Sequence, residues 1–124
     1  MSKDKNVETL TRGYAAFSAG DAEGAMRDFD DDIEWISPGN NALSGTYRGR
    51  AEIGAFFAKI AEKPFATTPS RFIADGDDVV VLTKVTVGDE SASGADLYTF
   101  RDGKVLRAEN FSDTAMMERV YGTK

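Results

Sequence analysis

The chain contains no cysteine and no histidine among its 124 residues. Without cysteine it can form neither a disulfide nor a thiolate metal site, and it has no thiolate nucleophile. Without histidine it cannot build a Ser-His-Asp or Cys-His site from its own residues, and it offers no imidazole to a metal. Acid–base chemistry therefore falls to aspartate, glutamate, tyrosine, lysine or bound water. We expect a protein that works without a metal or another cofactor.

Positive charge and long apolar runs are also scarce. Lysine and arginine number 15 against 21 acidic residues, which gives a net charge of −6. Nucleic acids and anionic membrane surfaces attract basic proteins, so neither is an expected partner. No apolar run approaches the ~20 residues that span a bilayer, and the opening MSKDKNVETL lacks the apolar stretch of a signal peptide. We expect a cytoplasmic protein with a single domain over residues 1–124.

Helical periodicity dominates the first half of the chain. A first helix is predicted by an apolar stripe that ends before Gly20, and Asp21 is a suitable start for a short second helix. A third helix is expected over residues 46–63, with an apolar stripe at i, i+3, i+4 and i+7. The residues of the first stripe are Val7, Leu10, Tyr14 and Phe17, and those of the third helix are Ile53, Phe56, Phe57 and Ile60.

Strand patterns dominate the rest. Residues 30–37 alternate in polarity, and residues 38–45 are rich in turn formers. The acidic run over residues 28–34 is typical of a solvated helix end and strand entry, and it lacks the spacing of an EF-hand calcium loop. A final helix is expected after Asp113, which suits its N-cap. Before it, four strands joined by short turns are predicted over residues 70–75, 78–87, 92–101 and 104–112, with antiparallel neighbours.

One of these predicted strands carries an acid on its aromatic side. Side chains alternate along a strand, so Asp96 points the same way as Tyr98 and Phe100. Burial of an unpaired carboxylate is costly and raises its pKa, which would make Asp96 a hydrogen-bond donor, an acid or a base near neutral pH. The alternatives are an acid held by a buried arginine or by backbone amides for structure alone, or a wetter sheet face.

Helices first and a meander of strands afterwards predict an α+β domain with helices on one face of a curved sheet. This order resembles the nuclear transport factor 2 superfamily, and within it the SnoaL-like and ketosteroid isomerase-like branch. The resemblance implies a cone-shaped, curved antiparallel sheet wrapped around N-terminal helices, as in cystatin-like folds. Proteins of this kind include isomerases, polyketide cyclases, epoxide hydrolases, dehydratases and binding modules, so the fold alone does not fix a reaction. The segments that carry the resemblance are YAAFSAGDAEGAMRDFDDDIEW, GTYRGRAEIGAFFAKI and LYTFRDGKVLRAENFSDTAMM.

The resemblance also assigns residues. Asp96 falls at the position of an aspartic acid that ketosteroid isomerases keep protonated as an oxyanion donor. Ser37, directly before Pro38, falls where those enzymes have their aspartate base, and a serine without an activating histidine cannot replace it. Steroid isomerisation is therefore not expected. A gapless alignment puts Gly13 at the position of the family's oxyanion-hole tyrosine, so Tyr14 fills that role only with a shift in register.

Six further residues are predicted to contact a substrate. Asn110 shares one face of the last strand with two small residues, Ala108 and Ser112. The alternative for Asn110 is that it satisfies neighbouring backbone groups. For the aromatic residues the alternative is a place in the core, and for Ser37 it is a cap on the turn at Pro38. The predicted catalytic residues are Asp96 and Tyr14, and the predicted substrate-binding residues are Phe17, Trp35, Ser37, Phe56, Tyr98 and Asn110.

These residues support three classes of function. The first is a cofactor-independent isomerase, cyclase or hydrolase acting on a small apolar organic molecule, with Asp96 as acid, base or hydrogen-bond donor. The second is a ligand-binding module without catalysis, which the serine at position 37 favours. The third is an interaction domain, and a homodimer is expected through the outer sheet face, where Val80 and Leu82 are apolar.

Overall fold

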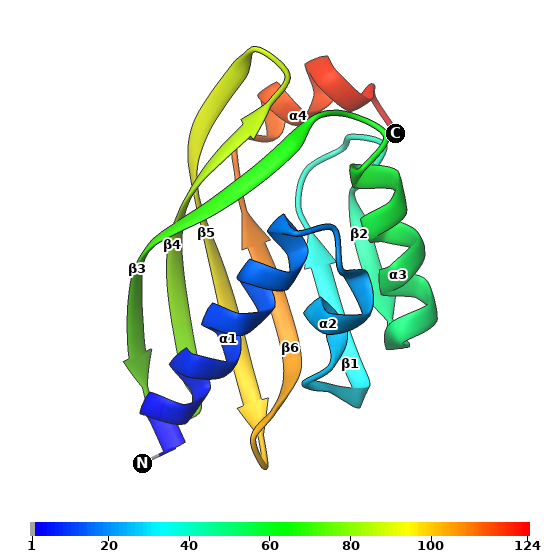
Figure 1. Cartoon of the computed structure of the whole chain (residues 1–124). Coiled ribbons are helices and arrows are strands. Elements are labelled where there is room, and N and C mark those ends of the chain that lie inside the picture. The colour runs from blue at the N-terminus through cyan, green and yellow to red at the C-terminus, as the bar shows by residue number, and fades with distance from the viewer. Residues whose placement is uncertain (1) are drawn as a thin grey trace.

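The computed structural model describes residues 2–124 and the side chains from Asp4 onward. Over these residues it contains four helices and six strands. Two helices precede the first strands, one helix separates them from a four-strand meander, and one helix follows (Figure 1). The elements are α1 (Ser2–Ser18), α2 (Ala22–Met26), β1 (Phe29–Ser37), β2 (Gly45–Arg48), α3 (Gly49–Ile60), β3 (Phe65–Asp75), β4 (Asp78–Val87), β5 (Glu90–Arg101), β6 (Lys104–Phe111) and α4 (Thr114–Tyr121).

The six strands form one sheet in the order β2-β1-β6-β5-β4-β3. Every neighbouring pair is antiparallel except β1 and β6, which run parallel. The predicted α+β class is confirmed, with a mixed sheet instead of a wholly antiparallel one. No hairpin joins β1 to β6, so turn geometry does not impose an antiparallel direction on that pair.

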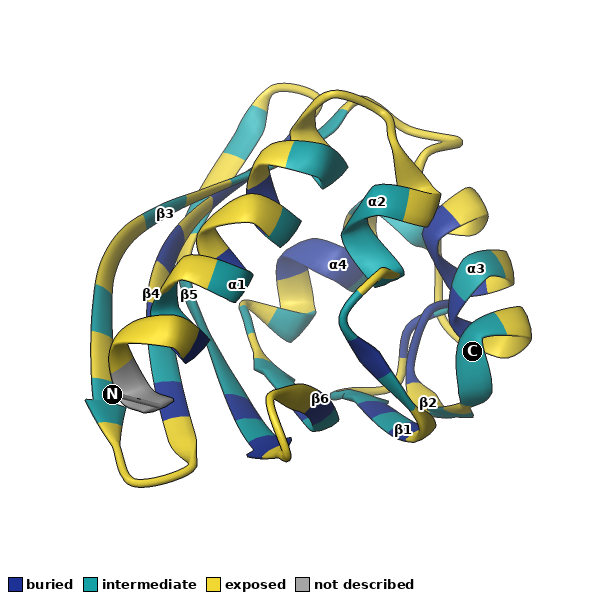
Figure 2. Ribbon diagram, turned by 60° about the horizontal axis from the view of Figure 1, so that its bottom comes forward, coloured by how far each residue is buried: buried dark blue, intermediate teal, exposed yellow. Residues whose placement is uncertain are grey.

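Helices α1, α2 and α3 lie on the concave side of the curved sheet, and α4 lies at one end of it (Figure 1). Helix α1 packs on β3 and β4, while α3 packs on β1 and β2. Buried positions lie on the strands of the sheet and on α1, α3 and α4 (Figure 2). The apolar stripes predicted for α1 and α3 supply much of this core, because Leu10, Tyr14, Ile53 and Phe57 are all buried. The core and the inner sheet face together enclose the site described below.

Three predicted boundaries are wrong, and one of them is the end of the third helix, which lies at Ile60 and not at residue 63. The third helix does not begin at residue 46, because residues 46–48 belong to β2, where Tyr47 pairs with Trp35. Gly49, with φ +80°, makes the turn from strand to helix in a conformation that suits glycine. Strand β3 begins at Phe65 instead of residue 70, and it contains Pro69. A proline is tolerated there because β3 is an edge strand, and the pairing shifts beside it.

Both predicted aspartate caps are confirmed. The Asp21 carboxylate accepts a hydrogen bond of 2.9 Å from the backbone N–H of Gly24 and starts α2. The Asp113 carboxylate accepts one of 2.9 Å from the backbone N–H of Met116 and starts α4. Each bond satisfies a donor that the first helical turn leaves without a partner.

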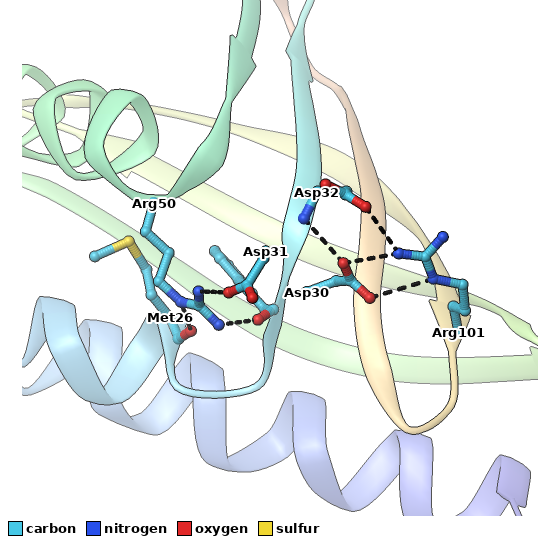
Figure 3. Close-up of polar contacts among 7 residues, drawn as sticks. Met26, Asp30, Asp31, Asp32, Arg50 and Arg101 are labelled. Carbon is cyan, nitrogen blue, oxygen red and sulfur yellow. Dashed lines mark hydrogen bonds and ion pairs between the residues drawn. The ribbon is translucent and has the colours of Figure 1, made fainter.

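Arginines hold the acidic run at the entry to β1 (Figure 3). The Arg101 guanidinium lies 2.9 Å from a carboxylate oxygen of Asp30 and 3.1 Å from one of Asp32. The backbone N–H of Asp32 donates to Asp30, and this bond together with Arg101 lowers the pKa of Asp30. These contacts hold the start of β1, where the register with β6 shifts.

Arg50 ties the start of α3 to the turn between α2 and β1 (Figure 3). Its guanidinium donates to the backbone carbonyls of Met26, at 3.4 Å, and of Phe29. It also forms an ion pair of 2.6 Å with the exposed Asp31. The two carbonyl contacts make Arg50 a structural link between α3 and this turn, since buried backbone acceptors need hydrogen-bond donors.

We expect Arg50→Met to lower the free energy of unfolding by about 1–2 kcal/mol, because two carbonyls lose a charged donor. Arg48→Met is the matched control, because Arg48 forms an exposed pair of 3.1 Å with Glu34. Such exposed pairs contribute ~0–1 kcal/mol. Urea denaturation of both variants measures the difference, and equal losses would contradict the structural role of Arg50.

The outer face of the sheet carries exposed apolar side chains. Ile73 on β3, Leu82 on β4 and Phe111 on β6 are 43%, 37% and 49% exposed. The predicted homodimer through this face stays a prediction, and so does the cytoplasmic location. Within the described part of the chain, no helix combines the length and the hydropathy needed to cross a bilayer.

Candidate functional site

A cavity of about 120 Å³ lies between the inner sheet face and the helices. Aromatic and aliphatic side chains form most of its wall, and Asp96 is the one carboxyl among the described residues that line it. All the residues predicted from the sequence to form a site lie around this cavity, although their chemical roles stay predictions. They are Tyr14, Phe17, Trp35, Ser37, Phe56, Asp96, Tyr98 and Asn110.

Strand register brings the polar residues of the cavity into one row. Asp96 on β5 pairs with Asn110 on β6. Ser37 on β1 lies one position beyond the Ile36–Glu109 pair, so it follows in the same row. Three residues from different parts of the sequence therefore reach the same level of the inner face.

Asp96 accepts hydrogen bonds from two side chains. The Tyr14 hydroxyl on α1 donates to its Oδ2. The Asn110 amide donates to its Oδ1 at 2.8 Å. No arginine and no backbone amide among the described residues is bonded to this carboxyl, which differs from the structural alternative considered for Asp96. Tyr14 is thus both a core residue, as its helical stripe predicts, and a direct partner of Asp96.

Two further donors fix the orientation of these partners. The Tyr98 hydroxyl donates to the Tyr14 hydroxyl at 2.9 Å. The Trp35 indole N–H donates to Oδ1 of Asn110 at 2.6 Å. An indole can only donate, so Asn110 must turn its carbonyl oxygen to Trp35 and its amide nitrogen to Asp96. Each donor in this network therefore points to Asp96 or to a residue that itself donates to Asp96.

The cavity changes the acidity of its hydroxyl and carboxyl groups. Burial raises the pKa of Asp96, while the hydrogen bonds from Tyr14 and Asn110 and the nearby Tyr98 hydroxyl act in the opposite direction. Burial and the neighbouring Tyr98 and Asp96 raise the pKa of Tyr14 well above its ordinary value. Burial, with the charge of Asp96, does the same for Tyr98. Both tyrosines stay neutral donors at physiological pH.

Aromatic rings build the wall beside this network. Trp35 makes edge contacts with Phe57 and Tyr98, at ring-centre distances of 5.5 and 6.1 Å. Ala108 pairs with Trp35 on one side and Tyr98 on the other, and its small side chain leaves room for the two rings to meet. Phe56 stacks on Tyr47 at 4.5 Å. Trp35, Phe56, Phe57 and Tyr98 are core residues and cavity walls at the same time, while Tyr47 is only partly buried and does not line the cavity.

Hydroxyl groups add polarity to the wall. The Ser37 hydroxyl has no hydrogen-bond partner among residues 4–124, and the same holds for Thr67, Thr83 and Ser112, which also line the cavity. Thr67 and Thr83 are absent from the sequence-based prediction of the site. Thr83 had a local signal, since it interrupts the valines on the inner face of β4.

Apolar parts of the wall come from distant segments. Leu43, from the loop before β2, and Met117, from α4, are buried and face the cavity. Neither has a sequence signal for this position, because the place of each side chain depends on how segments distant in the sequence pack together. Among the described lining residues there is no lysine and no arginine. The cavity can therefore hold an apolar molecule and exchange a proton with it through one carboxyl, but it supplies no cation for an anionic group.

The family of the chain follows from its sequence match. The model of the SnoaL-like domain matches residues 10–108, which is well over half of the chain. The chain belongs to the SnoaL-like domain family. This assignment agrees with the resemblance seen in the sequence, and the matched region includes Asp96 but not Asn110.

Similar proteins match nearly the full length of this SnoaL-like chain. TerC, crystallised with polyporic acid, is 31% identical with a TM-score of 0.85, and the match covers 96% of this chain and 99% of TerC. An NTF2-like protein of unknown function from Burkholderia pseudomallei is 28% identical with a TM-score of 0.83, over 94% and 97% of the two chains. An uncharacterised protein of Mycobacterium tuberculosis is 26% identical over 98% of this chain and 99% of its own length.

Proposed function

We propose that this SnoaL-like protein is a cofactor-independent isomerase, cyclase or hydrolase that acts on a small, largely apolar organic molecule in the cavity. One observation carries the proposal. The Asp96 carboxyl lies in an aromatic cavity, takes hydrogen bonds from Tyr14 and Asn110, and has no cationic partner among the described residues. A carboxyl in such surroundings has a raised pKa and suits proton transfer near neutral pH.

Asp96 would act on the substrate directly. In its ionised form it would accept a proton from a carbon beside a carbonyl group, or from a water molecule that attacks the substrate. In its protonated form it would return that proton at another position. Tyr14 and Asn110 would stabilise the ionised form through their hydrogen bonds, and the latter would also help to orient the substrate.

The remaining predicted residues would position the substrate. Trp35, Phe17 and Phe56 offer apolar surface, Tyr98 orients Tyr14, and the free hydroxyl of Ser37 offers a hydrogen bond. The TerC structure adds support, because a relative with the same fold was crystallised with an organic compound.

A ligand-binding module without catalysis is the second candidate. The observation that favours it is the serine at position 37, together with the presence of one carboxyl among the described lining residues. If Asp96 does not return the proton itself, the second group in the transfer must be a water molecule, a tyrosine or the substrate itself.

Titration of Asp96 by carboxyl-carbon NMR tests the proposal, with Asp96→Asn to assign the signal. We expect the pKa to lie above the ordinary value of ~3.9, because burial raises it. Since the folded pKa is raised, the stabilisation linked to the proton of Asp96 is complete below ~pH 3.9 and is lost as the pH rises through the folded pKa. The stability of Asp96→Asn should lack this decline. An Asp96 carboxyl that titrates at or below ~3.9 would contradict a poised acid and favour the binding module.

A further inference from the structure

We propose that the cavity selects a neutral, hydroxyl-bearing ring of about the size of benzene, whose hydroxyl donates to Asp96 and accepts from Asn110. This inference rests on the proposed function in one respect, namely that the cavity is the ligand site. It adds the size, the charge and the hydrogen-bonding polarity of the ligand.

Volume and charge limit the ligand first. The cavity of about 120 Å³ is close to an apolar protein cavity of ~150 Å³ that holds benzene. Its described lining contains the Asp96 carboxyl and no lysine or arginine. A carboxylate or phosphate on the ligand would lose its hydration beside a like charge and gain no counter-ion, so anionic ligands are disfavoured.

The direction of the hydrogen bonds decides the polarity at Asp96. Trp35 holds the carbonyl oxygen of Asn110, which forces the amide nitrogen toward the carboxyl. On the other side, Tyr98 donates to Tyr14, and Tyr14 donates to the carboxyl. An ionised carboxylate has about four acceptor positions, and these two donors occupy two of them. What Asp96 still offers to a ligand is therefore acceptor capacity, so the ligand must bring a hydrogen.

Asn110 supplies the complementary requirement. Its amide nitrogen carries two hydrogens, and one of them is bonded to Asp96, with no second partner among the described residues. A hydroxyl placed beside both residues can donate to the carboxylate and accept from this second amide hydrogen. An ether or a ketone can only accept, and an ammonium group can only donate. A hydroxyl is the simple group that satisfies both neighbours.

The test compares phenol, anisole and benzoate, which share a ring and differ in the polar group. Trp35 is the only tryptophan of the chain, so its fluorescence and its single indole N–H signal report on the cavity without further labelling. At about pH 8, above the ordinary carboxyl range, we expect phenol to bind at least ~10-fold more tightly than anisole. Benzoate is expected to bind more weakly than either.

Two variants that each remove one negative charge distinguish an effect of Asp96 in the cavity from an effect of the net charge of the protein. Asp96→Asn should bring the ratio of phenol to anisole affinity close to one. Glu109→Gln should keep the wild-type ratio, because Glu109 lies on the outer face of β6 and does not line the cavity.

Each other outcome contradicts a defined part of the argument. Equal binding of phenol and anisole to the wild-type cavity, or tightest binding of benzoate, would overturn the hydroxyl proposal while the cavity remains a ligand site. Failure of every probe to change the Trp35 signals would overturn the hydroxyl proposal together with the ligand site on which it rests.

Discussion

Asp96→Asn is expected to lower turnover by about 10²–10⁴-fold, which is the usual contribution of a general acid or base. Asparagine keeps the shape of the side chain, so the cavity should keep its volume, but its one oxygen can replace only one of the two carboxyl oxygens that accept from Tyr14 and Asn110. What the substitution removes is the exchangeable proton. A loss of this size with little change in KM would show that Asp96 acts in the transition state and not only in binding.

The assay needs a substrate, and the cavity limits the search to small apolar compounds with a carbonyl, hydroxyl or epoxide group. Mass spectrometry would detect the conversion of each compound. Glu109→Gln is the control for the loss of one charge, since Glu109 does not line the cavity. Unchanged turnover in Asp96→Asn would exclude the acid–base role. Compounds that bind to the wild-type protein but are never converted would favour the module without catalysis.

Ile53→Ala is expected to lower the free energy of unfolding by about 2–5 kcal/mol, the range found when a buried isoleucine is reduced to alanine. Ile53 is completely buried in α3. The same helix presses Phe56 and Phe57 against Trp35, with ring-centre distances of 6.0 and 5.5 Å. The space left by the missing atoms would also loosen this aromatic wall.

Lys59→Ala is the matched control, because Lys59 lies on the exposed side of the same helix. Its effect should stay within about 0.5 kcal/mol, as for most surface substitutions. Urea denaturation followed by Trp35 fluorescence compares the two variants. A loss below ~1 kcal/mol for Ile53→Ala would mean that the surroundings of α3 collapse into the vacated space.

Local periodicity was sufficient to predict the part of the site that lies on β5. Alternation along one strand places Asp96 and Tyr98 on the inner face, and no distant information is needed for this step. The apolar stripes of α1 and α3 were predictable for the same reason, since three- and four-residue spacing defines one helix face. The aspartate caps depend on residues within the same turn.

Features that depend on distant partners were not predictable in this way. Strand β2 has only four residues, and it exists because Tyr47 pairs with Trp35 across a loop. The start of β3 was missed because Pro69 weakens its strand pattern, while its pairing with β4 maintains the strand.

The hydrogen-bond network shows the same limit at the level of side chains. Strand alternation suggested Trp35 as a wall, and alternation together with the family resemblance suggested Asn110 as an orienting group. Their mutual bond, which fixes the amide and thereby the polarity at Asp96, requires the parallel pairing of β1 with β6. The gapless alignment favoured Gly13 over Tyr14, and only the packing of α1 shows that the Tyr14 hydroxyl reaches Asp96.

The parallel pairing of β1 with β6 also has a kinetic consequence. The contact between Trp35 and Asn110 joins residues 75 positions apart, and that between Tyr14 and Asp96 spans 82. Contacts between such distant residues slow folding, because large loops must close before they form. Until β1 docks, the edge of β6 is open to pairing with other chains, which exposes intermediates to aggregation. Recovery of ligand binding should therefore be among the last events of refolding, later than the appearance of strand signal from the β3–β6 meander.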